Sequence, residues 1–166
     1  MSIVTVKVQY AVAKEDVPQA NLISQWVKSA LSQAAKSRRL AAEVTVRVVG
    51  KKEITDLNHR YRHKNAPTNV LSFGYDIPPG TDLPLFGDIV ICAPIAAEEA
   101  IKQGKERDAH WAHLIVHGTL HLLGFDHEDP IAAMSMEALE TQILSQSGYP
   151  DPYLESSVLS ATFYTP

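Results

Sequence analysis

Apolar side chains occupy every second position in residues 4–10 and again in residues 44–48. A period of two places these side chains on one face of an extended chain, so both segments are predicted to be half-buried strands. Two mainly apolar runs, residues 70–73 and 88–92, flank a segment at 77–82 that holds two prolines and a glycine. We predict a third and a fourth strand there, separated by a turn-rich loop.

Five other segments carry apolar residues every three to four positions, which is the spacing of one face of an α-helix. The predicted helices cover residues 22–31, 54–61, 94–103, 106–123 and 130–147. Residues that begin or end helices support these bounds: Asp129 before Pro130 suits a capped first turn, and Gly148 suits a termination. The order of elements predicts the α/β (α+β) class, with about four strands in a mixed sheet packed with helices and a central histidine-bearing helix.

The chain has 166 residues, of which 45% are hydrophobic. This length suits one ordinary domain with a buried core and is too short for two. We therefore assign residues 1–150 to a single domain. Residues 151–166 show no clear periodicity and are predicted to form a loosely attached C-terminal extension.

Cys92 is the only cysteine, so the sequence does not call for an oxidising compartment. The amino terminus lacks the basic and apolar regions of a secretory signal, and no apolar run approaches membrane-spanning length. We therefore expect a soluble, cytoplasmic protein that does not bind membranes.

Charge is distributed unevenly along the chain. The formal net charge is −4, yet residues 36–64 contain nine basic and three acidic side chains. A basic segment inside an acidic protein is typical of a localised phosphate-binding surface. Solvated helix faces produce the same count, so the charge alone leaves both interpretations open.

Three histidines with metal-ligand spacing form the most specific feature of the sequence. His117 and His121 are four residues apart, which places them about 5–6 Å apart on one face of a helix. Gly124 can adopt the left-handed conformation that ends a helix and turns the chain, bringing His127 back toward the other two. The three imidazoles predict one divalent ion per chain, zinc by preference and other divalent ions as alternatives, with a fourth position open as in catalytic sites.

The same spacing occurs in the metzincin metalloproteases, which carry a glutamate general base directly after the first histidine. Here that position is Gly118. Without this carboxylate the attacking water has no proton acceptor in the motif, so the sequence disfavours peptide hydrolysis by the usual route.

Several residues near the three histidines have two interpretations. His110 and His113 could support the metal site, but we expect them to be exposed or to pack, because three ligands already complete a catalytic zinc site. Asp126 could orient a ligand imidazole or form a turn. Met134 and Met136 are expected in the core rather than under the metal.

Four stretches of the chain together resemble the YbeY family, bacterial metal-dependent endoribonucleases of ribosomal RNA maturation. They are HGTLHLLGFDH at 117–127, LNHRYR at 57–62, PTNVLSF at 67–73 and FGDIVI at 86–91. They occur in the family's order within about residues 55–130. One position differs, because Gly74 follows Phe73 where the family commonly has a proline.

The resemblance implies a single-strand-specific endoribonuclease that matures the 3′ end of small-subunit ribosomal RNA and acts in ribosome quality control. The implied partners are single-stranded or ribosomal RNA and the ribosome or its small subunit. It also implies that Arg62 is catalytic and binds substrate, since a guanidinium can hold a phosphate and stabilise its growing charge. An ordinary surface ion pair is the alternative for Arg62. Ser72 is expected to line the same substrate groove, and Asp88 either braces a basic side chain or faces water.

Two alternative functions stay open on the sequence. One is a metal-dependent hydrolase of another class, such as a peptidase that takes its base from outside the histidine motif. The other is a ribosome-assembly factor without catalytic activity, in which the ion only stabilises the fold.

Overall fold

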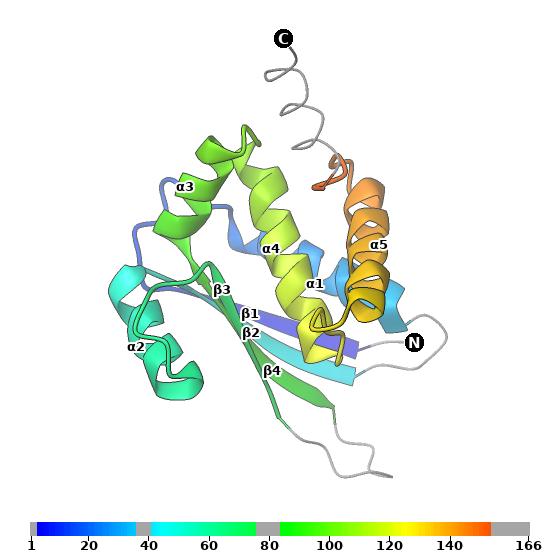
Figure 1. The fold of residues 1–166 in the computed structure, drawn as a ribbon, viewed down its shortest axis with the longest axis horizontal. Coiled ribbons are helices and arrows are strands. Elements are labelled where there is room, and N and C mark those ends of the chain that lie inside the picture. Colours follow the sequence, from blue (N-terminus) through cyan, green and yellow to red (C-terminus); the bar gives the residue numbers. More distant parts are fainter. Residues whose placement is uncertain (1–2, 36–40, 76–83, 154–166) are drawn as a thin grey trace.

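The four strands form one mixed sheet in a computed structural model that describes residues 3–35, 41–75 and 84–153. The strands are β1 (Ile3–Tyr10), β2 (Ala41–Val49), β3 (Val70–Gly74) and β4 (Leu85–Cys92), and their order across the sheet is β1-β2-β4-β3. The first three in this order are parallel, and β3 runs antiparallel to β4 at the edge. The predicted mixed sheet is therefore confirmed (Figure 1).

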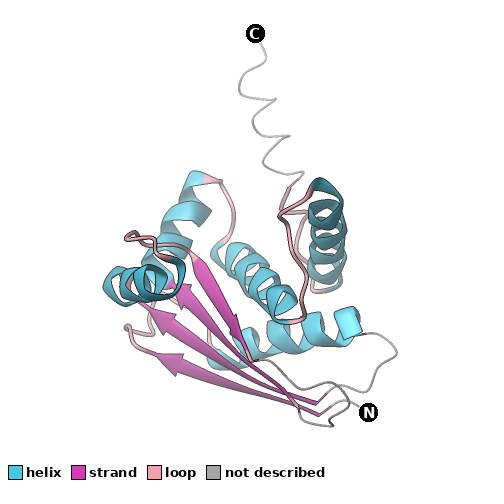
Figure 2. Ribbon diagram, turned by 60° about the horizontal axis from the view of Figure 1, so that its bottom comes forward, coloured by secondary structure: helices cyan, strands magenta, loops and turns pink. Residues whose placement is uncertain are grey.

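In these described ranges, five helices surround the sheet: α1 (Ala20–Ala35), α2 (Lys51–Arg62), α3 (Ala93–Lys102), α4 (Arg107–Leu122) and α5 (Pro130–Gln146). Helix α4 contacts α1, α3 and α5 as well as β3 and β4, so the histidine-bearing helix is central as predicted. Figure 2 shows the strands on one side of α4, with α1 and α5 on its other sides. The predicted α/β class is confirmed.

Alternation along the strands produces two separate cores on the two faces of the sheet. In β4, Ile89 and Ile91 belong to the large core with α1, α4 and α5, whereas Val90 and Cys92 belong to a small core beneath α2. Successive side chains of a strand point to opposite faces, so a strand buried on both faces is a continuous apolar run. The run at 88–92 therefore marks the strand that helices cover on both sides.

The observed elements differ from the predicted ones mainly at their ends. Strand β2 begins three residues earlier than predicted, and β4 also begins three residues earlier, because the two are paired in register from Ala42 and Leu85 onward. Asp129 caps α5 through its Oδ1, which accepts a hydrogen bond from the Ala132 amide at 2.8 Å. Residues 77–82, predicted to be a loop, lie outside the described residues.

The first residues of the predicted extension contact the domain. Pro152 is buried, and its carbonyl oxygen accepts a hydrogen bond from Lys105 Nζ at 3.0 Å. Residues 154–166 lie outside the described residues, so a boundary at 150 stays a prediction. Within the described ranges, no helix has the length and apolar character needed to cross a bilayer.

Candidate metal centre and substrate cleft

Helix α4 and the turn after it bring the three predicted ligands together. The ring centroids of His117 and His121 are 4.6 Å apart, and His127 lies 5.4 Å from the first and 5.0 Å from the second. His117 and His121 occupy successive turns of one helix face, and His127 approaches from the connection to α5. The structure therefore places all three where the spacing predicted.

The turn depends on Gly124. Its φ is 94°, in the left-handed region, and the Phe125 amide donates a hydrogen bond to the Leu120 carbonyl oxygen at 3.1 Å. This bond closes the end of α4 and reverses the chain. An L-residue at this φ is strained, so glycine here is the local reason that His127 returns to the helix.

The nitrogen positions fit a tetrahedral ion. The Nε2 atoms of His117 and His121 are 3.1 Å apart, and one ring nitrogen from each of the three histidines lies within 4.8 Å of the others. Two ligands of a tetrahedral zinc at Zn–N distances of about 2.0–2.1 Å stand about 3.3 Å apart. His127 is exposed while the other two are half-buried, so the centre is accessible from one side. The donor set therefore suits one divalent ion with an accessible face.

A buried carboxylate lies behind this centre. Glu140 of α5 is fully buried, and its Oε2 accepts a hydrogen bond from His117 Nδ1 at 3.0 Å. His113 Nε2 is 3.1 Å from the same oxygen, and the Tyr153 hydroxyl donates to Oε1 at 2.6 Å. Burial alone would raise the pKa of Glu140, but the donors from His113 and His117 outweigh it and lower the pKa to about 2. Glu140 is therefore an anion at neutral pH.

His121 is held as a neutral imidazole. Burial, followed by the neighbouring His117 and His127, lowers the pKa of His121 below its usual value. A metal ligand must present an unprotonated nitrogen, and a lowered pKa keeps the ring unprotonated at neutral pH. The environment of His121 therefore favours metal binding over protonation.

A cleft of about 300 Å³ joins the three histidines to Arg62 and Ser72. The remaining lining residues come from the loop before β3, from the first residue of β3, from α4 and from the C-terminal segment: Thr68, Asn69, Val70, His113, Leu114 and Tyr153. No acidic side chain lines this cleft in the ranges that the structure describes. Its walls therefore suit an anionic ligand.

Arg62 reaches the cleft from the last residue of α2. The next residue, His63, has a φ of 60° and turns the chain away from the helix, and the His63 amide bonds the His59 carbonyl oxygen. Arg62 is exposed and has no ion-pair partner among the described residues, so the surface ion pair considered as an alternative is not observed. Arg60 on the same helix is also exposed and does not line the cleft.

Ser72 lines the cleft and also holds β3 against α4. Its Oγ donates a hydrogen bond to the Gly118 carbonyl oxygen at 2.8 Å. A Cβ atom on Gly118 would lie 3.0 Å from Ser72 Oγ and 3.2 Å from Ile89 Cγ2. The glycine that stands in place of the metalloprotease glutamate therefore lets the helix pack closely on the sheet, where a Cβ atom would force its neighbours to shift.

We predict that Gly118→Ala destabilises the protein. Alanine gains up to about 1 kcal/mol of helix propensity over glycine, but overpacking against a short side chain and a strand costs about 1–3 kcal/mol, so a net loss of up to about 2 kcal/mol is expected. Denaturant unfolding measures this difference. Gly50→Ala is the control, because its Cβ would meet only Val12, at 4.0 Å. A midpoint for Gly118→Ala equal to that of the wild type would contradict the packing argument.

The structure also shows the contacts or burial of the two aspartates and two methionines considered from the sequence. Asp126 Oδ1 accepts from the amides of His127 and Glu128, so the turn interpretation is confirmed. Met136 is buried as expected, whereas Met134 is 72% exposed and the expectation of a core position was wrong for it. Asp88 Oδ2 accepts a hydrogen bond from the Tyr75 hydroxyl at 2.8 Å and does not line the cleft.

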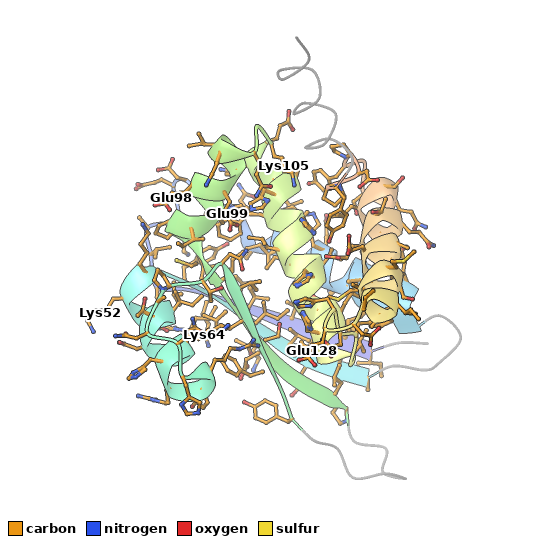
Figure 3. All side chains as sticks on the ribbon, viewed as in Figure 1. Lys52, Lys64, Glu98, Glu99, Lys105 and Glu128 are labelled. Atoms are coloured by element: carbon orange, nitrogen blue, oxygen red, sulfur yellow. The ribbon has the colours of Figure 1, made fainter. Side chains whose placement is uncertain are left out.

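His110 is buried, and through Glu99 it connects α4 to the loop before β3. Its Nε2 lies 2.9 Å from Glu99 Oε1, and Asn69 Nδ2 donates to the same carboxylate. Figure 3 labels Glu99 on α3, beside α4. Burial, opposed by the bond to Glu99, lowers the pKa of His110. Packing, one of the two roles expected for this histidine, is the observed one, and it positions Asn69 in the cleft.

The described basic side chains of the segment at 36–64 do not form one continuous surface of unpaired positive charge. Arg47 pairs with Glu53, Lys51 with Glu98 and Lys52 with Asp56. Residues 36–40 lie outside the described residues. The charges without a described carboxylate partner gather at the end of α2 and in the loop after it: Arg60, Arg62 and Lys64. The local charge that matters is therefore next to the cleft.

Three contributors to the site were not identified from the sequence. Glu140 and Tyr153 received no functional role, and His113 was expected only to be exposed or to pack. The available signal was weak: a lone glutamate among apolar positions of a helix gives no indication of a partner 23 residues away. A buried acidic position on the apolar face of α5 is the feature that could have suggested it.

The fold and site define a small α/β protein with a three-histidine centre open to a cleft. The sequence model of the family described as endoribonuclease YbeY matches residues 8–148. A protein named endoribonuclease YbeY from Nitrosococcus oceani is 52% identical over 152 residues, which cover 90% of this chain and 97% of that protein. A protein of the same name from Cellvibrio japonicus is 47% identical over 157 residues, which cover 95% of this chain and 87% of that protein. The chain therefore belongs to the YbeY family, and the resemblance seen in the sequence is confirmed.

A solved structure supports the fold. The solution structure of TM1509 from Thermotoga maritima superposes with a TM-score of 0.55 at 21% identity, covering 90% of this chain and 99% of that one. At this identity the similarity concerns the fold alone.

Proposed function

We propose that this protein is a metal-dependent endoribonuclease that cleaves single-stranded RNA in ribosomal RNA maturation, at the 3′ end of the small-subunit RNA, and takes part in ribosome quality control. The observation that supports it most is the cleft, which joins a three-histidine centre to an arginine without a carboxylate partner and has no acidic lining among the described residues. A phosphodiester brings the negative charge that such a cleft accommodates.

The proposed metal ligands are His117, His121 and His127, and the proposed ion is zinc, which accepts all-nitrogen sites and needs no redox chemistry. Another divalent ion is the alternative. When bound, the ion would supply Lewis-acid polarisation of the scissile phosphate and activation of water. The protein's contribution is to hold the three nitrogens in place and to leave one side of the centre open to the cleft.

Arg62 is proposed to bind the phosphate and to stabilise the charge that develops on it during cleavage. Ser72 is proposed to form the floor of the substrate site. Its hydroxyl hydrogen is already donated to Gly118, so its oxygen can only accept, as from a ribose hydroxyl. Both residues line the same cleft as the histidines.

The two alternative functions have less support. A peptidase needs a general base, and the cleft offers no carboxylate in the described part of the chain, while Gly118 has no space for one. A purely structural ion would be expected in a closed site with four protein ligands, whereas His127 is exposed and the centre opens to a cleft.

The proposed partners are ribosomal RNA and the ribosome or its small subunit, as the family resemblance implies. Because bacterial ribosomes are assembled in the cytoplasm, we propose that the protein works there. The buried, unpaired thiol of Cys92 is compatible with a reducing compartment.

The proposal predicts that metal-loaded protein cleaves a single-stranded RNA oligonucleotide and leaves casein intact. Chelator should abolish the RNA cleavage, and re-addition of zinc should restore it. Gel analysis of end-labelled RNA, with duplex RNA as the structural control, measures both effects. Chelator-sensitive casein cleavage that persists through stringent purification would favour the peptidase, and retention of metal without cleavage of any RNA would favour the assembly factor.

A further inference from the structure

We infer that Glu140 is the positioning residue of the metal centre: it fixes the orientation and tautomer of His117, and Tyr153 of the C-terminal segment holds Glu140 in place. This inference rests on the proposed metal ligation by His117. Glu140 does not line the cleft and is fully buried, so it acts on the centre only through the imidazole.

The ring of His117 has two nitrogens that face different partners. Nδ1 lies 3.0 Å from Glu140 Oε2, and Nε2 lies 3.1 Å from His121 Nε2, on the side of the candidate centre. A carboxylate can only accept hydrogen bonds, so Nδ1 must carry the proton and donate it. The neutral ring then has its lone pair on Nε2, which is the atom a metal ion would bind.

Glu140 itself is held by three donors from two segments. His117 and His113 approach Oε2 from α4, at 3.0 and 3.1 Å, and the Tyr153 hydroxyl donates to Oε1 at 2.6 Å. The ring of Tyr153 also packs edge-on against His113, with centroids 5.3 Å apart. An isolated buried carboxylate is costly, and this set of donors offsets the cost while it fixes the direction of each oxygen.

By spacing, His113, His117 and Glu140 could also hold an ion of their own. The hydrogen-bond geometry favours the positioning role, because each close approach pairs a carboxylate oxygen with an available donor. An ion there would require His117 to give up its Nδ1 proton and would displace both histidine donors from Glu140 Oε2. The same Glu140 charge would instead help to offset that of an ion at Nε2.

The inference predicts that Glu140→Gln weakens zinc binding by about 10–100-fold, the range typical for loss of a carboxylate partner of a ligand histidine. Competition with a chromophoric chelator measures the affinity on folded protein. Glu137→Gln, one turn earlier on α5 and half-buried, is the matched control and should bind as the wild type does. Tyr153→Phe removes one donor to Glu140 but leaves its bond to His117, so it should cost less than Glu140→Gln.

A second measurement uses the metal-free wild-type protein, so its result does not depend on whether the Glu140→Gln variant folds. Long-range ¹H–¹⁵N NMR of the metal-free wild-type protein, above the usual histidine pKa of about 6.5, should show His117 as the Nδ1-protonated tautomer. Detection of the Nε2-protonated tautomer would overturn the inference. So would a folded Glu140→Gln protein with wild-type zinc affinity.

The failure of the proposed function would look different. If His117→Ala kept wild-type zinc affinity, the proposed ligand set itself would be wrong. If His117→Ala lost the ion while Glu140→Gln kept it at wild-type affinity, the ligand set would stand and only the role of Glu140 would be withdrawn.

Discussion

Replacing His121 by alanine is expected to remove the bound divalent ion and with it RNA cleavage. His121 lies between the other two histidines, with ring centroids 4.6 and 5.0 Å away, so its loss leaves two of three ligands. Loss of a partner that merely supports a ligand costs about 10–100-fold in metal affinity, so loss of a ligand should cost more than about 100-fold. Metal analysis of purified protein and chelator competition measure the effect.

His59→Ala is the matched control for this experiment. His59 is exposed on α2 and does not line the cleft, so its removal should leave metal content unchanged. A His121→Ala protein that keeps a full equivalent of ion at wild-type affinity would remove this residue from the ligand set.

Replacing Arg62 by alanine is expected to lower RNA cleavage by about 100-fold, the scale seen when one electrostatic donor to a developing oxyanion is removed. Metal content and thermal unfolding should hardly change, because Arg62 is exposed and has no ion-pair partner among the described residues. Arg62→Lys should recover little, since a point charge cannot reproduce the bidentate guanidinium. Single-turnover cleavage of an end-labelled RNA measures the rate.

Arg60→Ala provides the matched control for Arg62→Ala. Arg60 lies two residues earlier on α2, is exposed and does not line the cleft, so its loss tests general attraction of RNA without touching the site. The double variant Arg62→Ala with His121→Ala should cost little more than the worse single one, since both residues act on one transition state. Wild-type cleavage by Arg62→Ala alone would exclude Arg62 from the mechanism, and wild-type cleavage by both single variants would identify the nuclease as a contaminant.

Helices and strands were predictable where one local pattern was sufficient. Asp129 before Pro130 marked the start of α5, and the Gly148 stop followed from a glycine able to adopt positive φ, which is 86° in the structure. Strand starts were less predictable, because the pairing of β2 with β4 extends both beyond their apolar runs. The side-chain pattern of one strand carries no information about how long its neighbour is.

The three-histidine group was predictable because its geometry is local. Helical spacing places His117 beside His121, and one glycine with left-handed φ returns His127, so nothing distant in the sequence is needed. The overlap of Arg62 with this centre in one cleft could not come from spacing. It depends on the edge position of β3, which follows α2 in the chain and packs against α4.

The sequence alone was sufficient for the class of fold, the family and the clustering of the three histidines, because these follow from periodicity and from short motifs whose residues are near one another in the chain. Only the tertiary structure could decide that Gly118 packs closely on the sheet, that Arg62 has no carboxylate partner among the described residues, and that Glu140 and Tyr153 lie behind His117. The packing of Gly118 and the bonds to Glu140 depend on contacts between residues 13 to 46 positions apart, which form only when α4, α5 and β3 pack together. Burial then determines their strength, because a hydrogen bond to a charge counts for more where water is excluded.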